Sequence, residues 1–223
     1  MASSRRQQAV DTIQRERVSA IIRTEDQSLA HDAIQAAVDG GFRVVEFTLT
    51  TPGALELISV FAKRSELLVG AGTVMTPALA RQAVEAGASF LVSPIYDRDV
   101  VVEAAALGAV CIPGAQTPTE METVHRSGAD FVKVFPAPAG GVDFIRAIRG
   151  PLPHLRLFPT AGATPDNFTE YLDAGCAGVG FVRTLFTSDN MSSGDFAAIR
   201  ERAAGIIRRL AAWRASNTER DVR

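Results

Sequence analysis

Short apolar runs alternate with longer amphipathic stretches along most of this chain. The runs are rich in β-branched residues, as buried strands are, and the stretches between them carry apolar residues at helical spacing. A repeated strand–helix order of this kind predicts an α/β fold built on a parallel sheet. The pattern predicts eight strands, at residues 18–22, 44–49, 67–70, 90–93, 109–112, 131–135, 155–159 and 178–182.

Two more helices are predicted outside this series. Residues 6–17, before the first strand, and residues 195–214, after the last, both carry helical apolar spacing. No proline- or serine-rich linker interrupts the series. We therefore expect one domain over residues 1–223, with its core at about residues 17–190.

Eight strand–helix units are compatible with two architectures. They form either an open doubly wound sheet or a closed barrel. Their number and even spacing favour a single (β/α)8 TIM barrel with an extra N-terminal helix and a C-terminal helix. Active sites of such barrels lie at the C-terminal ends of the strands, so we expect the chemistry of this chain there.

The composition limits the partners that we expect. Of the 223 residues, 47% are hydrophobic and 22% charged, so the chain can bury a large core. A formal net charge of -2 and scattered basic residues give no general attraction for nucleic acid. The sequence contains neither a recognisable secretion signal nor an apolar run of membrane-spanning length. We therefore expect a cytoplasmic protein that binds neither nucleic acid nor a membrane.

Cysteine and histidine positions give no indication of a metal site. Cys111 and Cys176 have apolar sequence neighbours, which predicts buried free thiols rather than a disulfide or a zinc site. The three histidines, His31, His125 and His154, fall in predicted helices or loops away from the strand ends. Without clustered histidines or carboxylates at ligand spacing, we expect no catalytic metal and no cofactor.

Lys133 is the most informative residue of the sequence. It lies mid-strand among bulky apolar neighbours, where lysine is rare because removing an ammonium ion from water is costly. Only one other lysine, Lys63, is present, and arginine cannot replace lysine as a nucleophile because it keeps its proton. A buried amine with a lowered pKa attacks ketones. The alternative is a lysine that reaches solvent or pairs with a carboxylate.

Glu46 is the predicted partner of Lys133. Strand alternation places Val44, Glu46 and Thr48 on one face of the second strand. If that face points inward, Glu46 compensates the lysine charge and moves protons as a general acid and base. A purely structural Glu46–Lys133 ion pair is the alternative.

Two glycine-containing turns are expected to complete a polar pocket. The segment 70–73 ends the third strand with small residues, and Thr73 offers a hydroxyl at the rim. The segment 158–162 does likewise after the seventh strand, with Thr160 and Gly162, where barrels often bind phosphate through backbone N–H groups.

Six motifs occur in a familiar order: VVEFTLTTPGA around Glu46, VGAGTV, Ser-Pro at 93–94, IPGAQTPTE, FVKVFPA around Lys133, and PTAG. Over residues 17–185 the chain resembles the 2-dehydro-3-deoxy-phosphogluconate aldolases, which also act on 4-hydroxy-2-oxoglutarate. The resemblance implies a class I, pyruvate-dependent aldolase that forms a homotrimer. It implies Lys133 as the Schiff-base lysine and Glu46 as the general base. It also implies that Thr73 and the Pro94 region hold the pyruvate carboxylate, and that Phe135 forms a wall of the pocket.

The sequence departs from the family pattern at three places. Thr50 stands where many members have a substrate-contacting arginine, so we expect Arg23, at the end of the first strand, to bind the carboxylate instead. Residues 160–162 read Thr-Ala-Gly rather than Thr-Gly-Gly, and residues 180–182 read Gly-Phe-Val rather than Gly-Gly-Ser. At these two turns we expect the backbone N–H groups of Gly162 and Phe181 to bind the far end of the substrate. Thr160, Gly180 and Arg183 are expected to contribute to the same end.

The sequence thus predicts a lyase that cleaves a 2-oxo-4-hydroxy acid reversibly to pyruvate and an aldehyde. The substrate is 2-dehydro-3-deoxy-6-phosphogluconate, which yields glyceraldehyde 3-phosphate, or 4-hydroxy-2-oxoglutarate, which yields glyoxylate, or both. The first belongs to the Entner–Doudoroff route of carbohydrate metabolism. The alternatives are a phosphate-binding barrel isomerase or synthase and a non-catalytic barrel of the same fold.

Overall fold

The computed structural model describes residues 2–221. In that range strands and helices alternate, and each of the eight predicted apolar runs contains a strand. The strands are β1 (Val18–Ile22), β2 (Val44–Thr48), β3 (Leu68–Gly72), β4 (Phe90–Val92), β5 (Val110–Ile112), β6 (Gly114–Ala115), β7 (Val132–Val134), β8 (Leu157–Pro159) and β9 (Val179–Phe181). The helices are α1 (Ala2–Glu16), α2 (Gln27–Asp39), α3 (Ala54–Phe61), α4 (Pro77–Glu85), α5 (Arg98–Ala106), α6 (Pro118–Arg126), α7 (Gly141–Arg149), α8 (Phe168–Asp173), α9 (Ser188–Ser193) and α10 (Phe196–Asp221).

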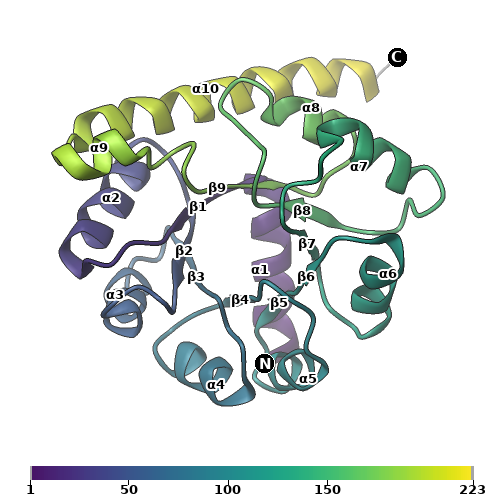
Figure 1. The fold of residues 1–223 in the computed structure, drawn as a ribbon, viewed down its shortest axis with the longest axis horizontal. Coiled ribbons are helices and arrows are strands. Elements are labelled where there is room, and N and C mark those ends of the chain that lie inside the picture. The colour runs from purple at the N-terminus through teal and green to yellow at the C-terminus, as the bar shows by residue number, and fades with distance from the viewer. Residues whose placement is uncertain (1, 222–223) are drawn as a thin grey trace.

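The strands form two parallel sheets, in the orders β5-β4-β3-β2-β1-β9 and β6-β7-β8. Only Pro113 separates β5 from β6, so one continuous segment pairs with β4 on one side and with β7 on the other. The carbonyl of Pro113 accepts a hydrogen bond of 2.8 Å from the Lys133 N–H. Figure 1 shows the strands around a common centre, with α2 to α8 outside them. The fold is therefore α/β, with a parallel sheet curved into a half-barrel.

Alternating side chains of the strands point to two different cores. Val45 and Phe47 pack outward against the surrounding helices, as parallel strands covered by helices require. Val44, on the opposite face of β2, packs inward with residues of four other strand segments and of α1. That inner cluster comprises Ala9, Val10, Ile13, Val44, Phe90, Val92, Val110, Ile112, Phe131 and Phe158.

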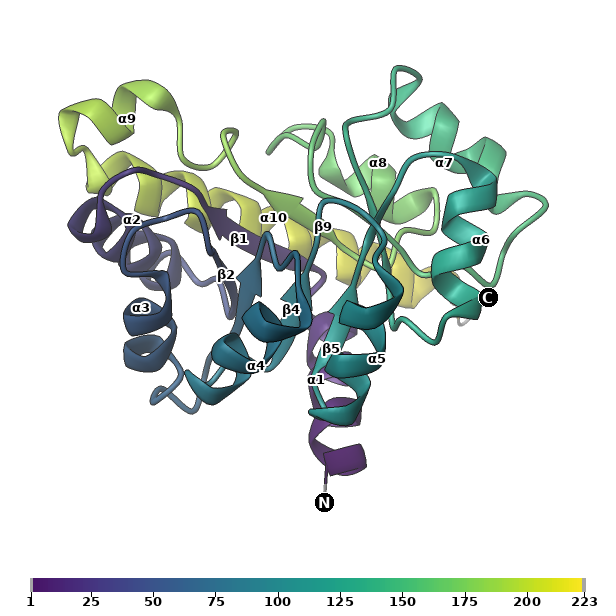
Figure 2. The ribbon, with the colours of Figure 1, turned by 60° about the horizontal axis from the view of Figure 1, so that its bottom comes forward.

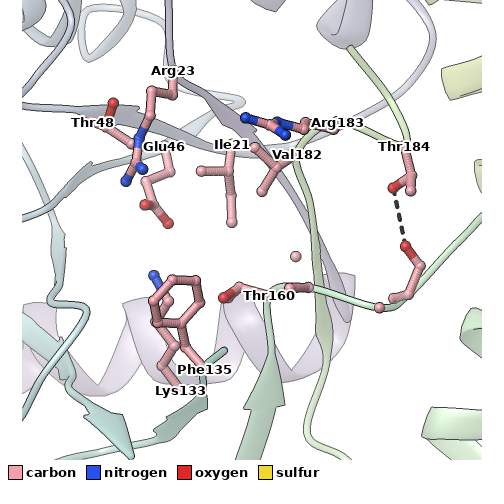
Figure 3. Close-up of a pocket in the computed structure, with 14 residues that line it drawn as sticks. Ile21, Arg23, Glu46, Thr48, Lys133, Phe135, Thr160, Val182, Arg183 and Thr184 are labelled. Carbon is pink, nitrogen blue, oxygen red and sulfur yellow. Dashed lines mark hydrogen bonds between the residues drawn. The ribbon is translucent and has the colours of Figure 1, made fainter. Parts of the chain in front are cut away.

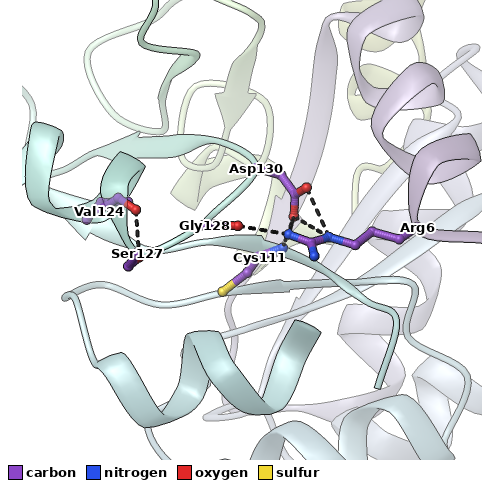
Figure 4. Close-up of polar contacts among 6 residues, drawn as sticks. All are labelled: Arg6, Cys111, Val124, Ser127, Gly128 and Asp130. Atoms are coloured by element: carbon purple, nitrogen blue, oxygen red, sulfur yellow. Dashed lines mark hydrogen bonds and ion pairs between the residues drawn. The ribbon is translucent and has the colours of Figure 1, made fainter. Parts of the chain in front are cut away.

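Helix α1 closes the amino-terminal ends of the strands. It lies behind the strands in Figure 1 and projects away from them in Figure 2. Arg6 anchors it, donating from Nε to Asp130 Oδ1 at 3.0 Å and from Nη2 to the Gly128 carbonyl at 2.9 Å (Figure 4). The same Asp130 carboxylate accepts the backbone N–H of Cys111 at 2.9 Å. The Asp130 carboxylate thus joins α1 to β5 and to the segment that leads into β7.

The helix predicted at residues 195–214 is confirmed as α10, and a further short helix, α9, precedes it. Gly194, in the left-handed conformation with φ 68°, ends α9 and redirects the chain into α10. Helix α10 packs along α2, as Figure 1 shows, and continues to Asp221. Across residues 2–221, no helix is both long and apolar enough to cross a membrane.

The prediction that Cys111 and Cys176 are buried free thiols is confirmed. Burial raises the pKa of each thiol to about 12. The nearby Asp130 carboxylate is the second cause of the raised pKa of Cys111, whereas Arg149 partly offsets the effect of burial on Cys176. Both side chains therefore act as small apolar groups rather than as nucleophiles.

Candidate active site

A cavity of about 480 Å³ lies at the carboxyl-terminal ends of the strands (Figure 3). It is on the side opposite α1, because its lining comes from residues within or just after β1, β2, β7, β8 and β9. Eight of the residues predicted from the sequence line it: Arg23, Glu46, Lys133, Phe135, Thr160, Gly162, Gly180 and Arg183.

Lys133 occupies the middle of β7 and is 7% exposed. Burial is the main reason why the pKa of its amine is lowered, and the Arg23 guanidinium lowers it further, while Glu46 opposes both. The Nζ atom lies 4.8 Å from the centroid of the Phe135 ring. The lowered pKa increases the fraction of neutral amine, which is the form that attacks a carbonyl carbon.

Glu46 occupies the middle of β2 and is 2% exposed. Burial raises the pKa of its carboxyl group, and the charges of Lys133 and Arg23 act in the opposite direction. Figure 3 shows the carboxyl group of Glu46 and the amine of Lys133 facing each other across the cavity. Both side chains line the same cavity, so a substrate bound there contacts both.

Arg23 and Thr73 form one polar end of the cavity. The Nη2 atom of Arg23 donates to Thr73 Oγ1 at 3.1 Å. Thr73 has φ 60°, a left-handed conformation that β-branched residues rarely adopt. Thr73 itself lies outside the cavity lining, but its hydroxyl fixes the guanidinium that lies inside it.

A threonine cluster follows β2. Thr48 Oγ1 lies 3.2 Å from the hydroxyl oxygens of both Thr50 and Thr51. Thr48 lines the cavity, whereas Thr50 does not. Thr50 therefore contacts the cavity only indirectly, through the hydrogen bond between its hydroxyl group and that of Thr48.

The far end of the cavity is formed by the segments after β8 and β9. Thr184 Oγ1 donates to the carbonyl of Ala163 at 3.0 Å and so ties the two segments together (Figure 3). Arg183 lines the cavity as well, and its side chain is exposed at the rim. Gly162, with φ 83°, allows the backbone to turn there. This end of the cavity therefore contains one cationic side chain, that of Arg183, and the backbone of two turns.

Gly180 keeps the cavity open between its two ends. A Cβ at position 180 would lie 2.6 Å from Cδ1 of Ile21, so the end of the Ile21 side chain would have to move. Glycine therefore lets β9 pass β1 without displacing Ile21.

Besides Thr50 and Thr73, two more predicted residues, Pro94 and Phe181, lie outside the cavity lining. The Phe181 side chain points to the outer core, where its ring centroid lies 6.1 Å from that of Phe42 and 5.6 Å from that of Phe168. This position of the side chain leaves the Phe181 backbone, whose N–H group is the predicted donor, for a role in binding. Pro94, half-buried, follows β4, and its carbonyl lies directly over Gly114 of β6.

Six of the lining residues were not predicted from the sequence. Strand alternation carried a signal for Thr48, since it shares a face with Glu46. The complete set is Ile21, Thr48, Ala161, Ala163, Val182 and Thr184. Among the described residues, no group of three or more histidine, cysteine, aspartate or glutamate side chains is placed to hold a metal ion.

A family model described as KDPG and KHG aldolase matches residues 10–202 of this chain. The chain belongs to the KDPG and KHG aldolase family. The 2-dehydro-3-deoxy-6-phosphogalactonate aldolase of Escherichia coli strain K12 is 36% identical over 166 residues, which cover 73% of this chain and 80% of that protein. The KHG/KDPG aldolase of the same strain is 38% identical over 179 residues, which cover 78% of this chain and 82% of that protein.

A solved relative has the same architecture. The KDPG aldolase from Legionella pneumophila, with pyruvate captured at low pH as a covalent carbinolamine intermediate, superposes with a TM-score of 0.80 at 28% identity. The match covers 89% of this chain and 97% of that chain. Membership of the family makes this chain an aldolase, and aldolases are lyases.

Proposed function

We propose that this chain is a class I aldolase that cleaves a 2-oxo-4-hydroxy acid reversibly to pyruvate and an aldehyde through a Schiff base on Lys133. One observation carries the proposal: a buried amine with a lowered pKa faces a buried carboxyl group with a raised pKa inside one cavity. The substrates are 2-dehydro-3-deoxy-6-phosphogluconate, an intermediate of the Entner–Doudoroff route, and 4-hydroxy-2-oxoglutarate. No cofactor takes part.

The reaction begins when the neutral Lys133 amine attacks the C2 ketone and forms a carbinolamine. Loss of water gives an iminium ion, whose positive nitrogen withdraws electrons from the C3–C4 bond. Glu46 accepts the proton of the C4 hydroxyl, the C3–C4 bond breaks, and the aldehyde leaves. The resulting enamine is protonated at C3, and water then releases pyruvate. The covalent carbinolamine in the Legionella relative supports the first step.

The two ends of the cavity bind the two ends of the substrate. Arg23, fixed by Thr73, binds the carboxylate beside C2, and the segment around Pro94 closes that end. Arg183 and the backbone N–H groups of Gly162 and Phe181 bind the distal anion. That anion is a phosphate in one substrate and a carboxylate in the other, and a guanidinium binds both.

We further propose that residues 1–223 form a single domain, a complete (β/α)8 barrel. The continuous β5–β6 segment and the 2.8 Å hydrogen bond from the Ala177 N–H to the Leu157 carbonyl, which joins β9 to β8, support closure. We also propose a homotrimer in the cytoplasm. The two buried free cysteines support a reducing compartment, such as the cytoplasm. Met75 and Ile95 are exposed apolar residues on one side of the fold, which supports a contact between subunits there.

Pyruvate exchange tests the aldolase proposal without assuming a substrate. An enamine-forming enzyme exchanges the methyl protons of pyruvate with deuterated water, which proton NMR detects. The wild type should catalyse this exchange and release pyruvate from at least one of the two substrates. Lys133→Ala should abolish both activities, whereas Lys63→Ala, at an exposed lysine, should leave both unchanged. A Lys133→Ala variant that retains exchange would contradict the proposal.

A further inference from the structure

A second cavity, of about 10 Å³, lies among the strands beneath the active site. Its polar lining consists of Ser19, Glu46 and Thr160, and its remaining walls are apolar. Glu46 and Thr160 also line the large cavity, so these two side chains separate the two spaces. The small cavity therefore lies directly behind the group proposed to move protons.

Two hydroxyl groups at this cavity are buried without a protein partner. Ser19 is 3% exposed and Thr160 is 5% exposed. Among the described residues, neither Ser19 Oγ nor Thr160 Oγ1 has a hydrogen-bond partner. Buried hydroxyls are rarely left unpaired in folded proteins, because each loses its hydrogen bonds to water on burial. The two positions therefore indicate a polar ligand held between them.

The size and chemistry of the cavity match a single water molecule. Its volume is at the lower limit for one water, roughly 10–15 Å³. Buried waters typically make about three hydrogen bonds, and Ser19, Thr160 and Glu46 supply that number of partners. Ile13 of α1 and Phe158 of β8 are among the apolar walls, so α1 separates this space from the solvent beneath the strands.

We propose that a water molecule bound by the hydroxyl groups of Ser19 and Thr160 donates a hydrogen bond to the Glu46 carboxylate, and that Ser19 is a positioning residue for Glu46. The hydroxyl groups donate to the water oxygen, and the water donates to the carboxylate from the side away from the substrate. Such a bond stabilises the ionised form of Glu46 and opposes the effect of burial. The catalytic role of this water rests on the proposed function, whereas the presence of the water does not.

Crystallography and carbon-13 NMR test the proposal together. A high-resolution crystal structure of the wild type should show an electron-density peak within hydrogen-bond distance of Ser19 Oγ and Thr160 Oγ1. In Ser19→Ala, NMR titration of the Glu46 side-chain carboxyl, assigned by comparison with Glu46→Gln, should show a pKa higher by about half to one unit. The acidic limb of the pH profile of turnover should move upward by the same amount.

Two variants control for the substitution itself. Ser19→Thr keeps the hydroxyl and should keep the wild-type titration of Glu46. Ser127→Ala removes a hydroxyl that bonds to the Val124 carbonyl far from the site, and should leave the titration unchanged (Figure 4). A wild-type crystal without the peak would overturn the water site, and an unshifted Glu46 titration in Ser19→Ala would overturn the role of Ser19. Failure of the aldolase proposal is separate, because it would appear as a wild type that neither exchanges nor releases pyruvate.

Discussion

Gly72 lies against the carboxyl group of Glu46, so close that a Cβ at position 72 would collide with Oε1. Gly72 is the last residue of β3 and pairs in register with Thr48, two residues after Glu46 on the neighbouring strand. Its missing side chain makes the space in which the Glu46 carboxyl group lies. Gly72, at the end of β3, therefore determines where the Glu46 carboxyl group can lie.

Gly72→Ala should displace the Glu46 carboxyl group and lower kcat by about tenfold to a hundredfold, the usual scale for misplacing a catalytic group. The overpacked methyl group should also cost about 1–3 kcal/mol of stability. Gly70→Ala is the matched control, since its methyl group would meet the Phe90 ring of the inner core instead. Gly70→Ala should lose stability but keep the wild-type pH profile of turnover. Steady-state kinetics and urea unfolding distinguish the two variants.

Glu46→Gln should retain imine formation but lower turnover by about 10²–10⁴-fold, because an amide cannot accept the C4 proton. The same variant should be more stable than the wild type at neutral pH. A carboxyl whose pKa is raised in the folded state favours folding below its unfolded pKa and loses that contribution as pH rises through the folded pKa. The stability difference should therefore vanish below about pH 4. Urea unfolding across this range measures it, and a difference independent of pH would argue against burial as the cause.

Thr73→Gly should raise stability and weaken binding at once. Glycine relieves the left-handed backbone of Thr73, a gain of roughly 1 kcal/mol, but removes the hydroxyl that fixes Arg23. We expect KM to rise about fivefold to tenfold while kcat changes little. Arg23→Lys, which keeps the charge but not the planar donor group, should raise KM by at least as much. An unchanged KM in both variants would remove Arg23 from carboxylate binding.

Asp130→Asn should destabilise the protein by about 1–2 kcal/mol, because it weakens the anchor between Arg6 and the strands. Asp143→Asn is the control, since it breaks the exposed Arg146–Asp143 pair and should change stability by less than about 0.5 kcal/mol. Urea unfolding monitored by circular dichroism measures both. Equal effects would mean that the α1 anchor contributes no more than a surface pair.

Much of the site was predictable because strand alternation is a strict rule. It grouped Glu46 with Val44 and Thr48 on one face of β2, which the structure shows to be the inner one, and the scarcity of lysine singled out Lys133. The same rule places Gly180 inward and Phe181 outward, in line with their observed positions, so only the backbone of Phe181 was a sound candidate.

Other features depend on contacts that no local pattern contains. Thr73 has a left-handed backbone conformation that is unfavourable for a β-branched residue. The role of Gly72 depends on Glu46, which belongs to the neighbouring strand. The first residues of α1 are polar and lack apolar spacing. The sequence pattern therefore predicts a helix that begins at residue 6, whereas the observed helix begins at Ala2. The break between β5 and β6 follows from Pro113, which has no N–H to donate.

Borohydride reduction in the presence of pyruvate tests the central claim most directly. Mass spectrometry of the digested protein should find a stable reduced pyruvate adduct on the peptide that contains Lys133, and an unmodified peptide that contains Lys63. Full release of pyruvate from substrate with the Lys133 peptide unmodified, or with the adduct on another residue, would contradict the account.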